Sequence, residues 1–446
     1  MDAQRGIARR MVIGLPSNGL SPAWERDFSA YPAAGVILFR RDFEDLEALR
    51  RLTARLRELA RPRRIFIAVD EEGGFVSQLA GSLTVPPNAA LLARGAKPGD
   101  IEWASRVTGE RLRSLGIDWV FAPVADVHSE RRNPVIGPRS FGVTPEEVSR
   151  ALGEAVEGFA AAGVASCLKH FPGHGDTEVD SHLALPVCRA DRATLERREL
   201  APFRAQLIAD SVMTAHVVYP ALDPERPATM SRAIAHDLLR GELGFPGVSI
   251  TDALEMKGAS GALGLTEAAR LALEAGCDLL LFAFHDEEVR RVRLELAKML
   301  VDQRLERANF DAARERLAAF DRRRPEPDAM ELSRPIESLT PPDFESRLEG
   351  IIERGIQIRG ELPAAAGPLE VIEVASRVPL DPAAIDDLKR RCEARPTALV
   401  ALAADAFLDE VPEAALRVSA LDATPLTRRV VAKRLETLTR NAGAPR

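Results

Sequence analysis

Three of the chain's seven histidines, His170, His174 and His182, fall within thirteen residues. They lie in the segment Lys169-His-Phe-Pro-Gly-His-Gly-Asp-Thr-Glu-Val-Asp-Ser-His182, whose proline and glycines indicate a loop that can approach a ligand closely. Asp180 stands two residues before His182. A carboxylate so near an imidazole can accept its Nδ1 proton and raise its basicity, so this pair is a candidate general acid/base near neutral pH.

The same cluster is also a candidate metal site. His170, His174, Asp176 and His182 all carry side chains that ligate zinc and similar ions. The residue types alone favour proton transfer and metal binding about equally.

A candidate nucleophile is Asp252, which closes an apolar run in Ile250-Thr-Asp-Ala-Leu-Glu-Met256. A carboxylate placed there can attack an anomeric carbon and form a covalent intermediate. Lys169 and Arg139 from other strands would keep it ionised and bind sugar hydroxyls. Taken alone, an aspartate at a strand end is more simply explained as a cap of the following turn.

The elements that position these residues alternate along the first 300 residues. Near-continuously apolar runs, typical of strands covered on both faces, alternate with stretches of helical period. The predicted strands cover residues 10–15, 35–39, 64–70, 118–126, 163–171, 211–219, 247–254 and 276–283. The pattern predicts an α/β fold, a (β/α)8 barrel over residues 1–323. An open doubly wound sheet is the alternative, weakened because no G-x-G-x-x-G follows an early strand.

In such a barrel the active site forms at the carboxyl ends of the strands. The polar residues that close the predicted strands are Asp70, Glu71, Glu72, Asp126, His128, Lys169, His170, His216 and Asp252. Five such strand endings in order indicate a functional site rather than scattered structural polar groups.

The rest of the chain begins with prolines that interrupt regular structure, which predicts an extended linker over residues 324–343. A small α/β domain is predicted for residues 344–446. It would contain strands at 355–359, 369–374, 397–402 and 416–420, with helices at 344–354, 383–392 and 426–438.

The composition, 46% hydrophobic and 28% charged, is that of a globular protein, and the net charge of −7 argues against nucleic acid as a partner. The four cysteines form no C-x-x-C pair, which favours a reducing compartment over a zinc knuckle or disulfide framework. The apolar stretch 11–15 is too short for a signal peptide or a membrane span. We therefore expect a cytoplasmic protein without a membrane partner.

Several segments together resemble the family 3 glycoside hydrolases, specifically their β-N-acetylhexosaminidase branch. They follow one another over about the first 285 residues: Asp70-Glu-Glu-Gly-Gly74, Asn133-Pro-Val-Ile-Gly137 with Arg139-Ser-Phe-Gly142, Lys169 to His182, Met213-Thr-Ala-His216, Pro227-Ala-Thr229 and Thr251-Asp-Ala-Leu-Glu-Met256. The Lys169 to His182 segment is the most specific of them.

The resemblance implies a retaining enzyme that releases terminal β-linked N-acetylglucosamine, often from bacterial cell-wall fragments, without a metal or cofactor. Asp252 would be the nucleophile and His182 the acid/base, oriented by Asp180. The substrate-binding residues would be Asp70, Arg139, Lys169, His170, Met213 and His216. A histidine acid/base does not repel an incoming anion, so phosphorolysis is an alternative reaction.

The chain departs from the family pattern at Phe75, Gln78 and Pro138, where the family commonly has two basic residues and one acidic residue. Phe75 and Pro138 leave open a catalytically silent sugar-binding protein on the same scaffold. The C-terminal part resembles a shortened form of the family's second domain. With 5% aromatic residues, the chain is better suited to a pocket for one terminal sugar than to a long stacking cleft.

Overall fold

The computed structural model describes residues 2–177, 185–261, 263–362, 369–376 and 380–442. Its larger part is an eight-stranded parallel sheet in the order β4-β3-β2-β1-β10-β9-β6-β5. The strands are β1 (Met11–Ile13), β2 (Gly35–Leu38), β3 (Phe66–Val69), β4 (Trp119–Val120), β5 (Cys167–Phe171), β6 (Ser211–Thr214), β9 (Val248–Ala253) and β10 (Leu279–Phe282). Isolated bridges from Trp119 to Ala165 and from Val124 to Lys169 join the β4 and β5 segments and close the sheet. The predicted (β/α)8 barrel is confirmed, and each predicted strand contains an observed one.

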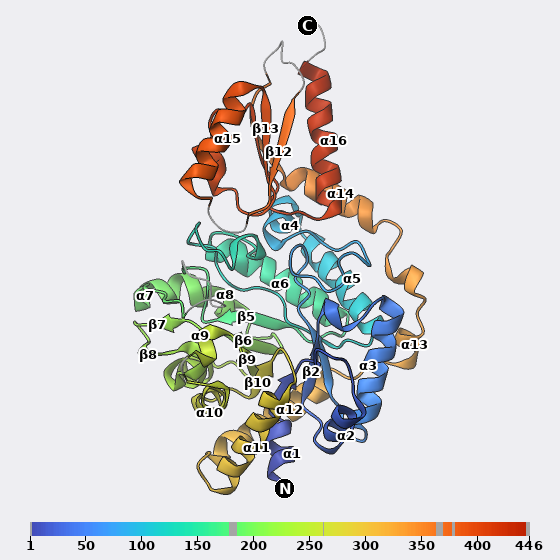
Figure 1. The fold of residues 1–446 in the computed structure, drawn as a ribbon, viewed down its shortest axis with the longest axis vertical. Coiled ribbons are helices and arrows are strands. Elements are labelled where there is room, and N and C mark those ends of the chain that lie inside the picture. Colours follow the sequence, from blue (N-terminus) through green and yellow to red (C-terminus); the bar gives the residue numbers. More distant parts are fainter. Residues whose placement is uncertain (1, 178–184, 262, 363–368, 377–379, 443–446) are drawn as a thin grey trace.

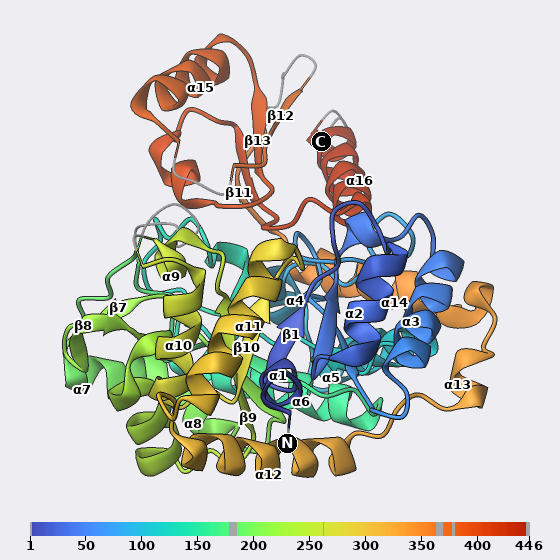
Figure 2. The same ribbon diagram turned by 60° about the horizontal axis from the view of Figure 1, so that its bottom comes forward.

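Helices surround the barrel between its strands (Figures 1 and 2). They are α1 (Ala3–Ala8), α2 (Pro22–Ala30), α3 (Leu46–Ala60), α4 (Ala89–Gly95), α5 (Asp100–Ser114), α6 (Pro145–Ala161), α7 (Arg192–Thr194), α8 (Leu200–Ala205), α9 (Lys257–Ser260), α10 (Leu265–Ala275), α11 (Glu287–Val301) and α12 (Arg307–Arg323). Two π-helical stretches, Leu195–Glu199 and Ala233–Glu242, and the hairpin of β7 (Val218–Tyr219) and β8 (Asp223–Pro227) complete this part.

Helix α6 illustrates how the sequence specifies these elements. Thr144 and Glu147 form a capping box at its start, and apolar residues recur every three or four positions along its buried face. At Gly158 a Cβ atom would lie 2.3 Å from the carbonyl oxygen of Glu102, so only glycine allows α6 to approach α5 this closely. Packing at this distance fixes the two helices that flank β4.

Three buried aspartates, Asp118, Asp210 and Asp278, stand directly before β4, β6 and β10, at the amino ends of the strands. Each accepts a backbone N–H from the neighbouring strand segment, namely from Ile67 (2.8 Å), Ser166 (3.1 Å) and Ser249 (2.9 Å) respectively. Each also pairs with arginines from elsewhere in the chain: Arg57 and Arg64 on Asp118, Arg324 on Asp210, Arg240 and Arg316 on Asp278. These pairs hold the base of the barrel together, at the end opposite to the expected active site.

Replacing Asp278 by Ala should lower the free energy of unfolding by about 3–5 kcal/mol, because Arg240 and Arg316 would lose the buried carboxylate between them. Urea denaturation measures this loss. The control is Asp311→Ala, which removes an exposed pair with Arg314 and should cost less than about 1 kcal/mol. Equal losses in the two variants would contradict a special role for the base aspartates.

The proline-rich stretch 324–343, predicted as an extended linker, contains two short regular elements. It forms α13 (Ala329–Leu332) and a 3₁₀ turn at Ile336–Leu339, and it lies against α5. Arg113 donates to the carbonyl oxygen of Pro325 at 2.6 Å and pairs with Glu331 at 2.6 Å, and Arg111 donates to the carbonyl oxygen of Leu339 at 3.0 Å. Proline lacks a backbone N–H donor but keeps its carbonyl acceptor, and Arg113 uses that of Pro325.

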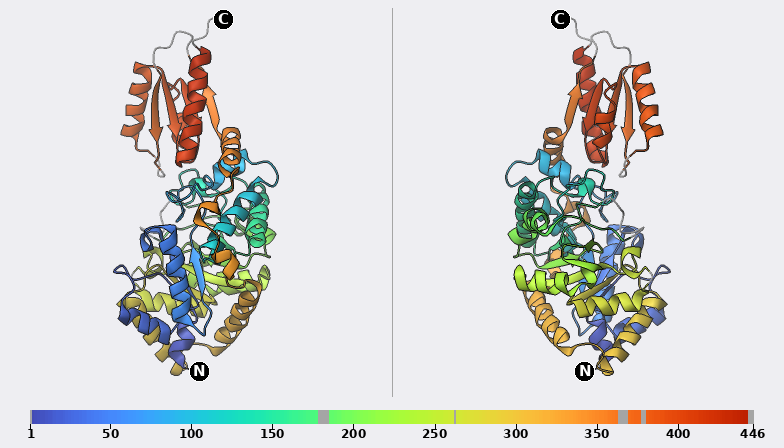
Figure 3. Two further views of the ribbon diagram at one scale, coloured as in Figure 1. Left: turned by 90° about the vertical axis from the view of Figure 1, so that its right-hand side faces the viewer. Right: turned by 90° about the vertical axis from the view of Figure 1, so that its left-hand side faces the viewer.

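The C-terminal part contains a second, four-stranded sheet in the order β11-β14-β13-β12, as the predicted α/β pattern requires. Its strands are β11 (Gln357–Gly360), β12 (Glu370–Val374), β13 (Thr397–Ala401) and β14 (Leu416–Ser419), and its helices are α14 (Phe344–Gly355), α15 (Pro382–Ala394) and α16 (Pro425–Ala442). Alternate residues of β13 face the two sides of the sheet, so that Leu399 packs with α15 and Val400 with α16. The two helices accordingly lie on opposite faces (Figure 3).

Helix α14 connects the two parts. Its buried side chains, among them Phe344 and Ile351, belong to the same apolar cluster as Trp103 of α5. At Gly95 of α4 a Cβ atom would lie 1.9 Å from the carbonyl oxygen of Ile351, which shows how closely α4 and α14 pack. The segment expected to open a separate domain thus packs on the barrel, and the division into residues 1–323, 324–343 and 344–446 stays a prediction.

Candidate active site

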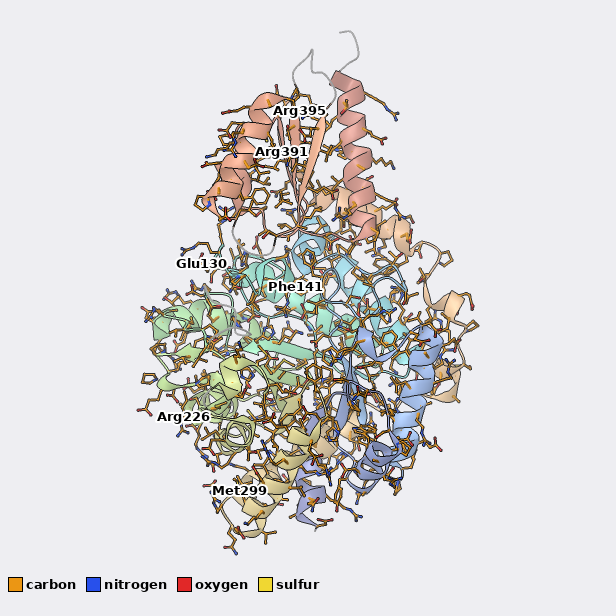
Figure 4. The ribbon with its side chains drawn as sticks, viewed as in Figure 1. Glu130, Phe141, Arg226, Met299, Arg391 and Arg395 are labelled. Atoms are coloured by element: carbon orange, nitrogen blue, oxygen red, sulfur yellow. The ribbon has the colours of Figure 1, made fainter. Side chains whose placement is uncertain are left out.

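The loops that follow the strands carry the candidate residues at the carboxyl end of the barrel. Figure 4 places Glu130, on the loop after β4, at the end of the barrel that faces the smaller sheet. The N–H of Glu130 donates to the carbonyl oxygen of Gly175 at 3.3 Å, so the loops after β4 and β5 lie side by side there.

Lys169, on β5, is the centre of a buried ion-pair network. Its Nζ lies 2.7 Å from Oδ1 of Asp70 and 2.5 Å from Oε1 of Glu72, and its side chain is 2% exposed. Arg139 donates to both oxygens of Glu72 at 2.8 Å. Two cations and two carboxylates therefore balance each other at the ends of β3, β4 and β5.

Burial and ion pairing shift the pKa values of Lys169 and Glu72 in opposite directions, and ion pairing has the larger effect. Burial lowers the pKa of Lys169, but Asp70 and Glu72 raise it above its ordinary value. Burial raises the pKa of Glu72, but Arg139 and Lys169 hold it well below its ordinary value. Lys169, Arg139 and Glu72 are thus charged at neutral pH.

Glu72 is a site residue that the motif analysis did not select, although it closes a predicted strand. Glu72 forms ion pairs with both Lys169 and Arg139, which were predicted as sugar contacts. It shares Lys169 with Asp70. The sequence feature that points to Glu72 is the run of three acidic residues after β3, of which only Asp70 was predicted to bind the sugar.

Asp126 and His170 form the second buried pair of the site. Oδ2 of Asp126 lies 2.7 Å from Nδ1 of His170, and Oδ1 accepts the backbone N–H groups of His170 at 3.1 Å and His174 at 2.6 Å. A carboxylate can only accept here, so Nδ1 of His170 carries the proton and Nε2 faces Arg139 at 3.5 Å. Burial raises the pKa of Asp126, but His170 and His174 outweigh this effect and keep it low.

Asp252, near the end of β9, is partly exposed at the carboxyl face. Its Oδ1 accepts the N–H of Ala253 at 2.7 Å, directly before the turn that follows β9, and the next helix, α9, begins only at Lys257. Burial raises the pKa of Asp252, but His170, His216 and the N–H of Ala253 more than compensate and hold it below its ordinary value. The carboxylate is therefore ionised at neutral pH, and the residue keeps part of its surface exposed.

His216 supports the backbone beside Asp252. Its Nε2 lies 3.0 Å from the carbonyl oxygen of Ala253, which can only accept, so Nε2 donates and Nδ1 accepts from the hydroxyl of Thr229 at 2.9 Å. Burial lowers the pKa of His216, which agrees with this neutral form. The predicted sugar contact Met213 is 2% exposed and packs in the interior of the barrel. The substrate-binding roles of both residues stay predictions.

The histidine-rich loop is anchored at its first half. Nδ2 of Asn133 donates to the carbonyl oxygens of His174 and Gly175 at 2.9 and 3.1 Å. The hydroxyl of Tyr219 donates to the carbonyl oxygen of Gly173 at 2.6 Å. Asn133 belongs to one of the segments that carry the family resemblance, but its contact with this loop was not predicted. Asp180 and His182 lie outside the described residues.

The metal interpretation finds no support in the part of the loop that the structure describes. Nδ1 of His174 faces the hydroxyl of Thr177 at 3.0 Å, and burial with the nearby His170 lowers the pKa of His174 to about 4. No group of three metal-ligating side chains occurs among the described residues. The four cysteines are buried and form no disulfide.

Two of the departures from the family pattern are engaged in the loop after β3. Oε1 of Gln78 accepts the N–H of Arg40 at 2.7 Å, and its Nε2 donates to the carbonyl oxygen of Asp70 at 3.1 Å. The N–H of Phe75 donates to Oδ1 of Asn88 at 2.9 Å. Gln78 thus joins the loop after β3 to the segment that follows β2.

Residues 21–320 match the model of the glycosyl hydrolase family 3 N-terminal domain. The chain belongs to glycosyl hydrolase family 3. The predicted resemblance is thereby confirmed, and with it the assignment to the glycosidases.

Curated relatives and a solved structure agree with this membership. The β-hexosaminidase of Chromobacterium violaceum is 40% identical over 327 residues, 71% of this chain and 90% of that protein. β-Hexosaminidase A of Pseudoalteromonas piscicida is 37% identical over 356 residues, and the match spans 73% of this chain but 58% of that protein. The structure of a family 3 β-N-acetylglucosaminidase from Paenibacillus sp. str. FPU-7 is 29% identical, covers 98% of this chain and 96% of its own, and gives a TM-score of 0.87. None of the helices described here is long and apolar enough to cross a membrane.

Beneath the histidine-rich loop lies Glu199, a buried carboxyl group. A Cβ atom added to Gly173 would lie 2.7 Å from Cβ of Glu199. Burial raises the pKa of Glu199 to about 7, even though Arg198 pairs with it. Arg198 also binds Asp176 at 2.5 Å, so Arg198 and Glu199 together support the part of the loop from Gly173 to Asp176.

Glu199→Gln should become more stable relative to the wild type as the pH rises. Glu199 has a pKa of about 7 in the folded chain and about 4.5 when unfolded, so the unfolded state loses its proton first and wild-type stability falls across this window. The neutral glutamine avoids this loss, and the difference should reach about 3 kcal/mol near neutral pH. Urea denaturation at a series of pH values measures it. A difference that stays constant over the window, or that appears equally in the exposed control Glu196→Gln, would contradict the assignment.

Proposed function

We propose that this chain is a retaining glycosidase that releases terminal β-linked N-acetylglucosamine. The observation that carries the proposal is Asp252, an ionised and partly exposed carboxylate at the end of β9, within the electrostatic influence of His170 and His216. The names of the relatives, β-hexosaminidase and β-N-acetylglucosaminidase, support the sugar. No metal and no cofactor takes part.

In the proposed reaction Asp252 attacks the anomeric carbon while the bond to the leaving group breaks. His182, with its Nδ1 proton held by Asp180, protonates the departing oxygen from Nε2. The resulting neutral imidazole then takes a proton from water, whose oxygen attacks the same carbon and releases Asp252. Two displacements at one carbon give overall retention of configuration.

The buried network supplies the hydroxyl contacts in this proposal. Lys169 has three N–H donors and uses two on Asp70 and Glu72, which leaves one for a sugar hydroxyl. Asp70 is partly exposed and would accept from another hydroxyl, with Arg139 and His170 beside it. These groups suit a pocket for one terminal sugar, and cell-wall fragments in the cytoplasm are the substrates we infer.

Asp252→Ala should lower kcat for an aryl N-acetyl-β-glucosaminide by at least about a thousandfold, because no covalent intermediate can form. Azide should restore part of the rate and yield the α-glycosyl azide, since it replaces the missing nucleophile from the same face. The control Asp237→Ala removes an exposed carboxylate and should leave kcat unchanged. Wild-type turnover of Asp252→Ala would exclude the assignment.

His182→Ala should slow substrates with poor leaving groups by about a hundredfold or more, and activated nitrophenyl glycosides much less, because only the former need protonation. A Brønsted plot of log kcat/KM against leaving-group pKa measures the contrast. His236→Ala, at an exposed histidine, is the control. Equal slowing of all substrates by His182→Ala would be incompatible with an acid role.

Phosphorolysis is the alternative that a histidine acid/base favours, because it does not repel phosphate as a second carboxylate would. The same assays with added inorganic phosphate decide between the two. Free N-acetylglucosamine as the product supports the hydrolase, whereas the sugar 1-phosphate would identify a phosphorylase. Absence of turnover by the wild type would instead favour the silent sugar-binding protein.

A further inference from the structure

The smaller sheet contacts the barrel at Asn88, directly beside the loop after β3. Asn88 is 1% exposed. Its Nδ2 donates to the carbonyl oxygen of Leu421 at 2.8 Å, and its backbone N–H donates to Oδ1 of Asp422 at 3.0 Å. One barrel residue thus forms two hydrogen bonds to the segment that follows β14.

The side-chain oxygen of Asn88 binds the loop after β3 instead. It accepts the N–H of Phe75 at 2.9 Å. A Cβ atom on Gly74 would lie 1.9 Å from this oxygen, and the N–H of Gly74 donates to the carbonyl oxygen of Pro86 at 2.9 Å. The loop therefore rests directly on Asn88 and its neighbours, with no room for a side chain at Gly74.

On the C-terminal side, Asp422 is fixed by the start of α16. It is fully buried, and its Oδ2 accepts the hydroxyls of Thr424 at 2.5 Å and Thr427 at 2.6 Å and the N–H of Thr424 at 3.1 Å. Because every one of these donors lies on the C-terminal part, the position of Asp422 depends on how that part folds.

On the barrel side, a tight turn joins Phe75 to the ion-pair network. Glu72 donates its N–H to the carbonyl oxygen of Val76 at 2.8 Å, and Val76 donates to that of Gly73 at 3.1 Å. Glu72 in turn binds Lys169 and Arg139. A displacement of Phe75 therefore moves the carboxylate that both cations require.

We propose that Asn88 is a positioning residue through which the C-terminal sheet sets the place of Glu72 and its two cations. The proposal rests on the proposed function, because sugar binding by the network is its kinetic readout. It gives the C-terminal part of the chain a role in catalysis without any of its side chains touching the substrate.

Two other contacts between the two parts lie away from this connection. The pair of Arg131 and Asp409 is 63% and 50% exposed, and such a pair contributes little. Arg354 of α14 binds Asp100 at 2.9 Å and the carbonyl oxygen of Gly95 at 2.8 Å, at the far end of α4 from Asn88. Arg354→Ala is therefore a matched control, since it loosens the same interface away from the loop.

The kinetic experiment compares Asn88→Ala with Arg354→Ala in the full chain. Asn88→Ala should raise both KM and the inhibition constant of N-acetylglucosamine by at least about tenfold, because a displaced network binds the sugar poorly. Arg354→Ala should leave both constants within about twofold of the wild type. A merely structural role would lower the active fraction, and so the apparent kcat, while leaving KM and the inhibition constant unchanged.

A second variant, Thr427→Val, acts from the other side. It removes one donor from Asp422 without touching the barrel, and it should raise the inhibition constant by about threefold. If Asn88→Ala does not fold, Thr427→Val decides the outcome. Unchanged constants in the folded variants, or equal changes in Arg354→Ala, would overturn the proposal.

Hydrogen exchange of the backbone amides at residues 70–78 provides a readout that needs no substrate. Exchange there should accelerate by at least about tenfold in Asn88→Ala and clearly in Thr427→Val, but not in Arg354→Ala. If the wild type fails to bind or cleave the sugar, the proposed function fails while the exchange data still test the coupling. Unaltered exchange in both variants would show that the C-terminal sheet does not hold this loop.

Discussion

The ammonium group of Lys169 between Asp70 and Glu72 is the interaction on which the site depends. A lysine with a side chain 2% exposed stays charged only next to carboxylates, and Glu72 stays charged only next to Lys169 and Arg139. The fold must therefore bring the ends of β3 and β5 together, with the turn that carries Arg139 beside them. A parallel barrel does so because it places the carboxyl ends of successive strands on one face.

The balance of charge within this network has a chemical consequence. The two cations of this network pair with Asp70 and Glu72, and the pKa of Asp252 is held below its ordinary value by His170, His216, the N–H of Ala253 and, to a smaller extent, Lys169. Asp252 is left as a partly exposed residue without a direct ion pair among the contacts described for it. Such a group can form a bond to carbon, whereas a carboxylate held by two cations would first have to leave them.

The two ends of the barrel use the same kind of residue for different purposes. At the base, Asp118, Asp210 and Asp278 bind strand N–H groups and arginines and contribute stability. At the opposite end, Asp70 and Asp252 keep part of their surface exposed. At this end Asn88 also connects the barrel to the C-terminal sheet through its hydrogen bonds with Leu421 and Asp422.

The strands and their closing residues could be predicted because apolar runs and the polar residues after them are local features of the sequence. The role of Glu72, the base aspartates and the contact of Asn88 with Asp422 could not, because each joins residues far apart in the chain. The short helix and 3₁₀ turn within residues 324–343 could not be predicted, because Arg111 and Arg113 of α5 bind the carbonyl oxygens of Leu339 and Pro325 there. The apolar periodicity predicted where the strands end, and the family resemblance of the motif segments indicated which strand endings form one site.

The most direct test of the central claim is to trap the glycosyl-enzyme. A fluorinated N-acetylglucosaminyl fluoride, which forms the covalent intermediate faster than it is hydrolysed, is incubated with the full chain, and the labelled peptide is identified by mass spectrometry. The account predicts one sugar per chain, attached to the carboxylate of Asp252. A label on another residue, or turnover without any covalent adduct, would contradict it.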